Sequence, residues 1–219
     1  MKQIAIGDVH GCLKTLDRLL EKLELTADMH LIFVGDYVDR GPDSKGVIQR
    51  LIELREHYTC TFLRGNHESM FLEYLEEGVD EIWSMNGGRE TVGSYLNGSE
   101  DASFPDDHVE FVQATTYFHE TEDYFFVHAG LKPFLTIEEN KGQVDPEVFL
   151  WERSHLNVDE YAWEKVVVCG HTPVSKPIDH PQLINIDTGC VYRFNPLLGK
   201  LTAVILPERE FVIVRNTDW

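Results

Sequence analysis

Five short polar segments contain the side chains of this chain that could bind metal ions. They span residues 7–11, 35–41, 64–68, 128–130 and 170–172. Together they supply carboxylate oxygens, an amide oxygen and imidazole nitrogens, which are the ligands of hard-to-borderline divalent cations. A carboxylate can bridge two cations, and Asp36 is well placed to do so. The candidate metal ligands are Asp8, His10, Asp36, Asn66, His128 and His171.

Each polar segment directly follows an apolar, strand-like run. These runs span residues 3–6, 31–34, 59–63, 124–127 and 166–169. In α/β sheets, ligands bind at the carboxyl ends of the strands, so five such segments can converge on one site. Asp8 could instead cap a helix, and each histidine alone could be structural. Folding by itself, however, does not require six potential ligands at successive strand ends.

The spacing of apolar residues predicts the elements that hold these segments. Leucines 13 to 23, and apolar residues 47–54 and 70–75, recur at helical spacing after the first three strands. Strands that alternate with helices indicate βαβ units with parallel strands. Residues 78–121 are acidic and predict a mostly helical insertion, whereas β-type runs dominate from residue 124 onward. We therefore expect one domain over residues 1–219, with two mixed sheets and a terminal hairpin.

The bulk properties restrict the class of protein. The formal net charge is −19, from 19 basic and 38 acidic residues, which argues against a nucleic-acid partner. No apolar run approaches the roughly 18 residues of a membrane span, so no membrane association is expected. The first strand leaves no room for a signal peptide, and the four cysteines form no C-x-x-C pair. We expect reduced thiols and a cytoplasmic protein.

The motifs GDVHG, GDYVDRG and GNHE, followed by HAG and GHT, resemble the phosphoprotein phosphatase family of calcineurin-like metallophosphoesterases, in its small bacterial form. The resemblance extends from Asp8 to about Gly189, and five motifs in family order are highly specific. It implies an α/β fold with two mixed β-sheets flanked by helices, a four-layer αββα sandwich. It also implies two divalent metal ions, with Mn²⁺ expected and Fe or Zn suited to the same ligands.

The resemblance assigns a role to each motif residue. Asp8, His10 and Asp36 would bind the first metal, and Asp36, Asn66, His128 and His171 the second, so that Asp36 bridges. A metal-bridging hydroxide would attack phosphorus directly, without a phosphoenzyme.

The remaining motif residues would serve the leaving group and the phosphate. His67 would be the general acid, oriented by Asp39. Arg40 and Arg64 would bind the phosphoryl oxygens, and Arg153 would supply a third, less specific match. Other polar residues carry weaker signals. Arg89 and Tyr192 are candidate substrate contacts, and Asp187 is a candidate to orient a ligand. Five further histidines lie outside the motifs and are expected to be structural or on the surface: His30, His57, His108, His119 and His155.

Three functions remain open at the level of sequence. A serine/threonine protein phosphatase is favoured because the chain has Asp39 and Glu68, where symmetrical diadenosine tetraphosphate hydrolases have Ala and Asp. That second activity is the alternative, and a non-catalytic metal-binding scaffold is the third. The expected partner is a phosphorylated protein or peptide, or a small phosphoester.

Overall fold

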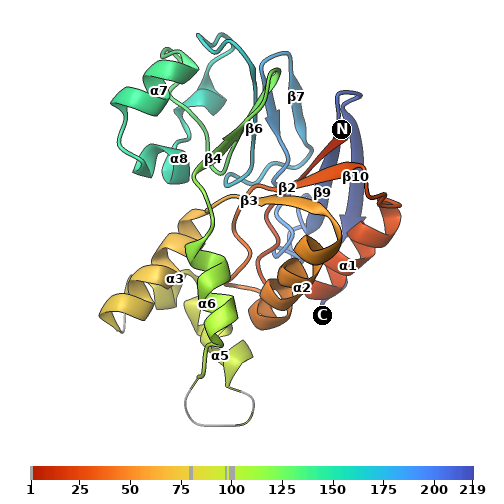
Figure 1. Ribbon diagram of the computed structural model, residues 1–219, viewed down its shortest axis with the longest axis vertical. Coiled ribbons are helices and arrows are strands. Elements are labelled where there is room, and N and C mark those ends of the chain that lie inside the picture. The colour runs from red at the N-terminus through yellow and green to blue at the C-terminus, as the bar shows by residue number, and fades with distance from the viewer. Residues whose placement is uncertain (1, 79–80, 97, 99–101) are drawn as a thin grey trace.

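Two mixed β-sheets lie against each other at the centre of the computed structural model, and helices cover their outer faces (Figure 1). The structure describes residues 2–78, 81–96, 98 and 102–219. Each sheet has five strands. The α/β sandwich of two mixed sheets that the resemblance implied is confirmed.

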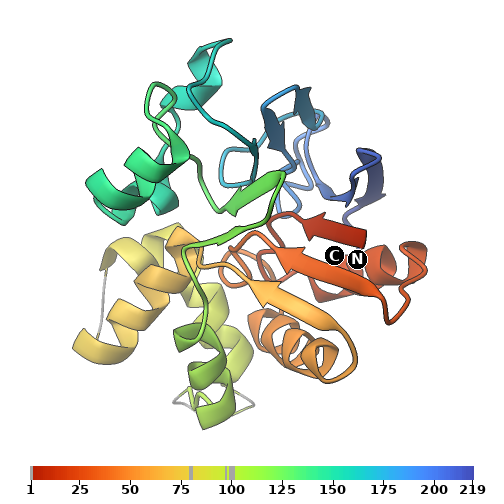
Figure 2. The ribbon, with the colours of Figure 1, turned by 45° about the horizontal axis from the view of Figure 1, so that its top comes forward.

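The first sheet has the strand order β10-β9-β1-β2-β3. Its three N-terminal strands run parallel (Figure 2). Strand β9 pairs antiparallel with β1 and with β10. The predicted C-terminal hairpin is therefore present. The strands span Lys2–Ile6 (β1), Met29–Phe33 (β2), Thr59–Phe62 (β3), Lys200–Leu206 (β9) and Glu210–Arg215 (β10).

The second sheet has the order β4-β5-β6-β8-β7, with a parallel centre and one antiparallel strand at each edge. Both edge strands, β4 and β7, have only three residues each, which is too short to show an alternation of apolar and polar residues in the sequence. One of these, β4, belongs to the segment that was expected to be mostly helical. The strands span Phe118–Glu120 (β4), Tyr124–Val127 (β5), Val166–Cys169 (β6), Ile178–His180 (β7) and Leu183–Asn185 (β8).

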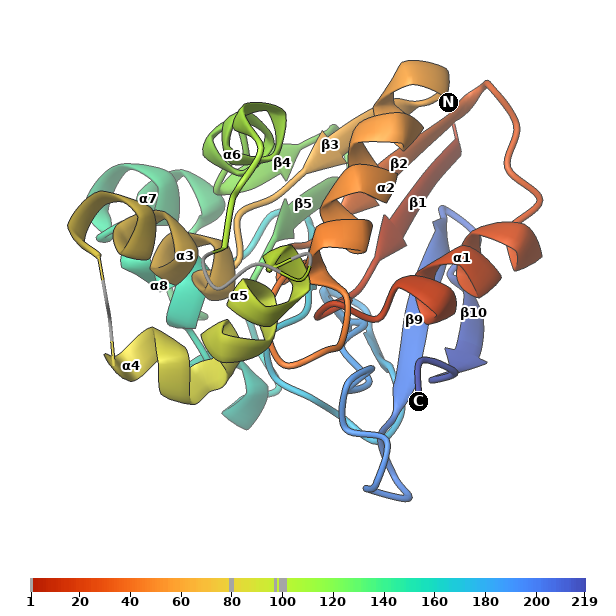
Figure 3. The same ribbon diagram turned by 90° about the horizontal axis from the view of Figure 1, so that it is seen from below.

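Helices α1 and α2 lie along the outer side of the first sheet, and α7 and α8 lie beside the second (Figures 1 and 3). Among the described residues, none of the helices combines the length and apolar character that a membrane span needs. The helical elements span Leu13–Lys22 (α1), Ser44–His57 (α2), Asn66–Glu77 (α3), Glu81–Trp83 (α4), Ser84–Gly88 (η1), Arg89–Tyr95 (α5), Asp106–Gln113 (α6), Ile137–Gln143 (α7), Glu147–Trp151 (α8) and Ser154–Asn157 (η2).

Three hydrophobic layers hold the four structural layers together. Side chains alternate across a strand, so Ile4 and Ile6 of β1 pack toward α1 and α2, while Ala5 faces the second sheet. Val168 of β6 joins Ala5 in the layer between the sheets. Val167, its neighbour, packs on the other side with residues of α7 and α8. The fold thus buries both faces of each sheet and leaves the strand ends to carry polar residues.

Candidate active site

All five predicted polar segments meet at the carboxyl ends of the strands. Side chains of three of them, 35–41, 64–68 and 170–172, line a cleft of about 240 Å³, whereas the buried Asp8, His10 and His128 are not among its lining residues. The first three segments follow β1, β2 and β3, and the last two follow β5 and β6. Asp36, Arg40, Asn66, His67, Asn86, Trp151, Arg153, His171, Thr172, Pro173 and Tyr192 line the cleft.

The backbone adopts a left-handed conformation at five non-glycine residues of these segments. The φ angles are 45° at His10, 54° at Asp36, 73° at Asp39, 67° at Arg40 and 63° at His171. Each such non-glycine residue costs roughly 1–3 kcal/mol, and such residues cluster at active sites. The surrounding structure must therefore hold these turns in place.

Glu68 holds one of these turns. Its buried carboxylate accepts hydrogen bonds from the backbone N–H groups of Asp36 (2.8 Å), Tyr37 (2.7 Å) and Gly65 (2.9 Å). Burial and the nearby charge of Asp36 raise the pKa of Glu68 to about 7, although the backbone donors oppose this change. Glu68 thus fixes the loop after β2 against the start of α3.

Asp36 lies at the centre of the candidate metal ligands. One carboxylate oxygen is 3.4 Å from His128 Nε2, and the other is 3.4 Å from His10 Nε2. Burial alone would raise the pKa of Asp36, but positive charge on the surrounding histidines, when they are protonated, outweighs burial and lowers it. Two clusters share this residue: His10, Asp36 and His67 form one, and Asp36, His128 and His171 form the other, each with its candidate ligand atoms within 4.8 Å of one another.

The proton positions of the histidines leave lone pairs that point into the site. His128 Nδ1 lies 2.9 Å from the carbonyl oxygen of Val34 and donates to it. Burial lowers the pKa of His128 and favours the neutral ring, whose Nε2 then carries no proton. That Nε2 is 3.0 Å from Asn66 Oδ1, which is also an acceptor. His10 repeats the pattern, because its Nδ1 donates to Val38 O and its Nε2 accepts from the Arg40 guanidinium at 2.8 Å. Acceptors this close repel each other unless a cation lies between them.

Asp8 carries a second sign of a cation site. Its Oδ2 accepts a hydrogen bond from the backbone N–H of His171 at 2.9 Å. Its Oδ1 is buried, and within the described part of the chain it has no hydrogen-bond partner. Burial, and then the charges of Asp187 and Asp36, raise the pKa of Asp8 well above its ordinary value. An orphaned buried carboxylate oxygen is costly, and a bound cation would satisfy it. The residues present therefore fit divalent metal ions.

The pair of His67 and Asp39 is also in place. His67 Nδ1 donates to Asp39 Oδ2 at 2.6 Å, and His67 Nε2 lies 4.0 Å from Asp36 Oδ2. Burial lowers the pKa of His67, but Asp36 and the hydrogen bond to Asp39 outweigh burial and raise it. His67 can therefore hold a proton on Nε2, facing the cleft.

Two residues that sequence reasoning missed complete this pair. Trp83 donates its indole N–H to Asp39 Oδ2 at 2.9 Å, and Thr91 donates its hydroxyl to Asp39 Oδ1 at 2.7 Å. Both come from the segment that was expected to be a helical insertion. The contacts join residues 44 and 52 positions apart, and no local motif marks them.

The three predicted phosphate-binding arginines lie in different places. Arg40 and Arg153 line the cleft, and Arg153 Nε donates to His171 Nε2 at 3.0 Å. Arg64 is not among the lining residues: it donates to Thr115 Oγ1 (3.1 Å) and to the carbonyl oxygen of Gln113 (2.9 Å). The structure therefore does not bring Arg64 to the cleft, and its predicted contact with phosphate remains a prediction.

Of the residues with weaker sequence signals, some line the cleft and others do not. Tyr192 lines the cleft, and Asp187 is buried, with a charge that raises the pKa of Asp8. Arg89 lines a neighbouring hollow together with Arg40. Trp151 also lines the cleft, although no motif pointed to it.

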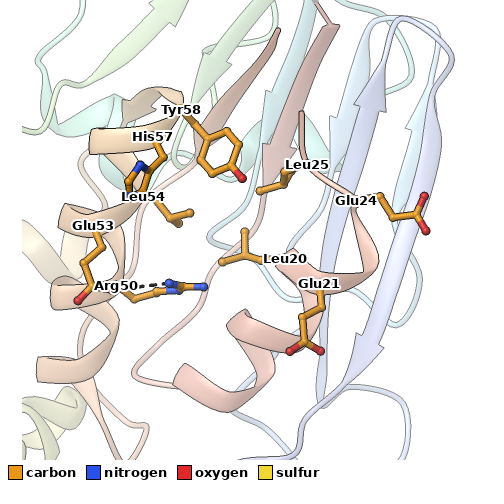
Figure 4. A pocket seen from close by; sticks show the side chains of 9 residues that line it. All are labelled: Leu20, Glu21, Glu24, Leu25, Arg50, Glu53, Leu54, His57 and Tyr58. Carbon is orange, nitrogen blue, oxygen red and sulfur yellow. Dashed lines mark ion pairs between the residues drawn. The ribbon is translucent and has the colours of Figure 1, made fainter. Parts of the chain in front are cut away.

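A larger hollow of about 560 Å³ lies elsewhere, between the C-terminal parts of α1 and α2 (Figure 4). It contains none of the predicted site residues. Glu21, Glu24 and Glu53 give it an acidic rim, and Arg50 within it is paired with Glu53 at 3.6 Å. Size therefore does not identify the site of chemistry in this chain.

Comparison with known proteins agrees with the geometry. The bis(5'-nucleosyl)-tetraphosphatase PrpE [asymmetrical] of Oceanobacillus iheyensis is 30% identical, over 99% of this chain and 93% of its own length. The serine/threonine-protein phosphatase 1 of Salmonella typhimurium is also 30% identical, over 85% of this chain and 86% of its own.

Solved structures share the fold. A crystal structure provisionally named a diadenosine tetraphosphatase superposes with a TM-score of 0.74, at 23% identity, over 100% of this chain and 95% of that one. A cold-active protein-tyrosine phosphatase from a Shewanella species has a TM-score of 0.63, at 17% identity, over 98% of this chain and 78% of that one. The family model described as calcineurin-like phosphoesterase matches residues 1–201, and the chain belongs to this family.

Proposed function

We propose that this metallophosphoesterase hydrolyses bis(5'-nucleosyl) tetraphosphates. The observation that carries the proposal is the near full-length similarity to tetraphosphatases. The cleft of this chain, which Asp36, Arg40 and His67 help to line, supports it. The sequence favoured a serine/threonine phosphatase, but the relatives support the tetraphosphatase alternative better. Those relatives are named asymmetrical, whereas the sequence analysis considered the symmetrical activity. We therefore propose cleavage into two unequal nucleotides.

The side chains of the cleft suit a polyphosphate substrate. Arg40 and Arg153 present guanidinium groups at its walls, and their planar forks match phosphate oxygens. The chain as a whole is strongly acidic, so these local cations must offset repulsion of the anionic substrate.

Members of this family use divalent metal ions. His10, Asp36, His128 and His171 belong to the two clusters that could hold a metal, and Asp8 and Asn66 would complete the predicted ligand set for two ions. When bound, these ions would supply Lewis acidity and lower the pKa of a water molecule that attacks phosphorus. Mn²⁺ remains our expectation for the metal, with Fe or Zn suited to the same nitrogen and oxygen donors.

His67 would donate its Nε2 proton to the departing oxygen, and Asp39 would hold the ring in the required tautomer. The hydrogen bond at 2.6 Å fixes the proton of Nδ1 toward Asp39, which leaves the Nε2 proton for the substrate. The raised pKa of His67 favours the protonated acid that this role needs.

A serine/threonine protein phosphatase is the second candidate. The intact pair of Asp39 and His67 favours it, because a serine or threonine alkoxide needs a proton more than a phosphate does. Arg64 would serve either substrate only if its side chain left Thr115 and turned toward the cleft.

The test compares three substrates on metal-stripped chain with and without Mn²⁺: diadenosine tetraphosphate, a phosphothreonine peptide and para-nitrophenyl phosphate. Separation of the nucleotides by chromatography distinguishes ATP with AMP from two ADP molecules. Metal-dependent formation of unequal products supports the proposal, and equal products indicate the symmetrical alternative. A clear preference for the peptide would overturn the proposal in favour of the protein phosphatase. No turnover despite bound metal would indicate a scaffold.

A further inference from the structure

We propose that Trp151 and Tyr192 form a nucleobase-binding subsite at the mouth of the cleft. The inference rests on the proposed function and deepens it, because it assigns residues to the nucleoside part of the substrate. Trp151 is the last residue of α8, and Tyr192 lies in the loop that precedes β9. Both line the same cleft as Asp36 and His171.

Both aromatic residues are partly exposed to solvent. Trp151 is 44% exposed and Tyr192 is 38% exposed. Large aromatic residues are mostly buried in folded proteins, so two exposed aromatic side chains in one polar cleft indicate a ligand-binding role. The two residues belong to different parts of the chain, so a single exposed loop does not account for the exposure of both.

Residues of the site hold each ring in position. The Trp151 and His171 rings are nearly perpendicular, at 87°, with centroids 5.7 Å apart. The guanidinium carbon of Arg40 lies 5.9 Å from the centroid of Tyr192. Both rings are therefore positioned directly beside groups that would bind phosphate or metal, yet each keeps surface open to solvent.

This combination matches the chemistry of a nucleotide. Arginines recognise the phosphates, and aromatic side chains stack on a base with little regard to its identity. Thr172 lines the same cleft and adds a polar residue to the wall that also carries Trp151 and Tyr192. A nucleotide would bring a base to these rings, whereas a phosphothreonine side chain would bring none.

The experiment compares AMP with ribose 5-phosphate, which has a hydroxyl group in place of the base. Isothermal titration calorimetry on the Mn²⁺-reconstituted chain measures the Kd of each. We expect AMP to bind about tenfold more tightly, as base stacking on an aromatic ring allows. The ratio of the two Kd values should fall toward one in Trp151→Ala and Tyr192→Ala. Trp151→Phe and Tyr192→Phe should restore most of it.

Phe134→Ala is the matched control, because Phe134 is 71% exposed but is not among the residues that line the cleft. This variant should keep the wild-type ratio. Equal Kd values for AMP and ribose 5-phosphate in the wild type would overturn the subsite. A preference for AMP that survives both alanine variants would overturn it too.

The same proteins are assayed with diadenosine tetraphosphate, which separates the two proposals. Hydrolysis without a base-dependent Kd ratio would leave the proposed function standing and remove the subsite. A base-dependent ratio that both alanine variants abolish, without hydrolysis, would remove the proposed function and retain a nucleotide-binding subsite.

Discussion

At the scale of single residues, the importance of His67 as a general acid depends on the basicity of the leaving group. A phosphate is a much weaker base than an alkoxide, so its departure needs less help from a proton donor. We expect His67→Asn to lower kcat/KM for a phosphothreonine peptide by roughly 10²–10⁴. The loss for diadenosine tetraphosphate should be about tenfold or less, by the same Brønsted argument. Steady-state kinetics on both substrates tests this, and equal losses would contradict a role as general acid.

Trp83 acts on the same chemistry through Asp39. Its indole N–H and His67 Nδ1 both donate to Asp39 Oδ2, at 2.9 Å and 2.6 Å. We expect Trp83→Phe to lower kcat for the phosphothreonine peptide about tenfold, since a hydrogen bond to a charged group is worth about 1.5–3 kcal/mol. KM should hardly change, because Arg40 and Arg153 are untouched.

The control for Trp83 is Trp163→Phe, which removes an equivalent indole donor far from the chemistry. Trp163 is buried and donates to the carbonyl oxygen of Lys132 at 3.1 Å. If both variants lowered kcat alike, the role of Trp83 would be a general structural one. If Trp83→Phe raised KM and left kcat intact, the positioning of His67 through Asp39 would be wrong.

At the scale of elements, the C-terminal end of the chain caps α1. The residue before this helix, Cys12, makes no capping hydrogen bond with its side chain. The buried carboxylate of Asp218 instead accepts from the backbone N–H groups of Lys14 (2.8 Å) and Thr15 (3.1 Å), and from the Thr15 hydroxyl. Such a cap satisfies donors at the helix start and favours its dipole.

We therefore expect Asp218→Ala to lower the free energy of unfolding by about 2 kcal/mol, at the upper end for a helix cap. Urea denaturation measures the change. Asp123→Ala, which removes an exposed carboxylate of the same charge, should change it little. An unfolding curve for Asp218→Ala that matches the wild type would show that Asp218 does not stabilise α1.

The elements also show what a sequence can predict. Asp8, Asp36 and His171 could be placed together because each directly follows a buried strand, and parallel strands end at one edge. The start of helix α7 also has a local sequence signal. Thr136 and Glu139 form a capping box, and the pattern T-x-x-E is typical of that motif. Strand β7 had none, because three residues are too few.

Contacts between distant segments were beyond the sequence for a different reason. Trp83 reaches Asp39 across 44 positions, and only the path of the whole segment after α3 brings them together. Trp151 faces the cleft for a similar reason, because α8 packs through Phe149 against the second sheet. The sequence also does not predict the direction in which a side chain points. Arg64 lies in its motif, but Thr115 and Gln113 accept hydrogen bonds from its guanidinium and hold it away from the cleft.

At the scale of the whole molecule, the candidate ligands come from both sheets. Asp8, His10, Asp36 and Asn66 follow strands of the first sheet, whereas His128 and His171 follow strands of the second. The chain passes between the two sheets after β3 and again after β8. At this edge, direct contacts such as the hydrogen bond from His171 N–H to Asp8 also join the sheets. Divalent cations bound there would link the two sheets and reduce the electrostatic repulsion between the buried carboxylates.

Binding of metal to the folded state alone should therefore raise the unfolding temperature. At a free Mn²⁺ concentration 100 times Kd, the stabilisation is about 2.7 kcal/mol, which corresponds to about 5–10 °C for a chain of this size. Differential scanning calorimetry of the metal-stripped chain, with and without Mn²⁺, measures the shift. Asp36→Asn removes the shared ligand and should abolish most of it, whereas Asp159→Asn, an exposed carboxylate, should keep it. An equal shift in Asp36→Asn would place the metal elsewhere on this acidic surface, and no shift in the wild type would contradict a metal link between the sheets.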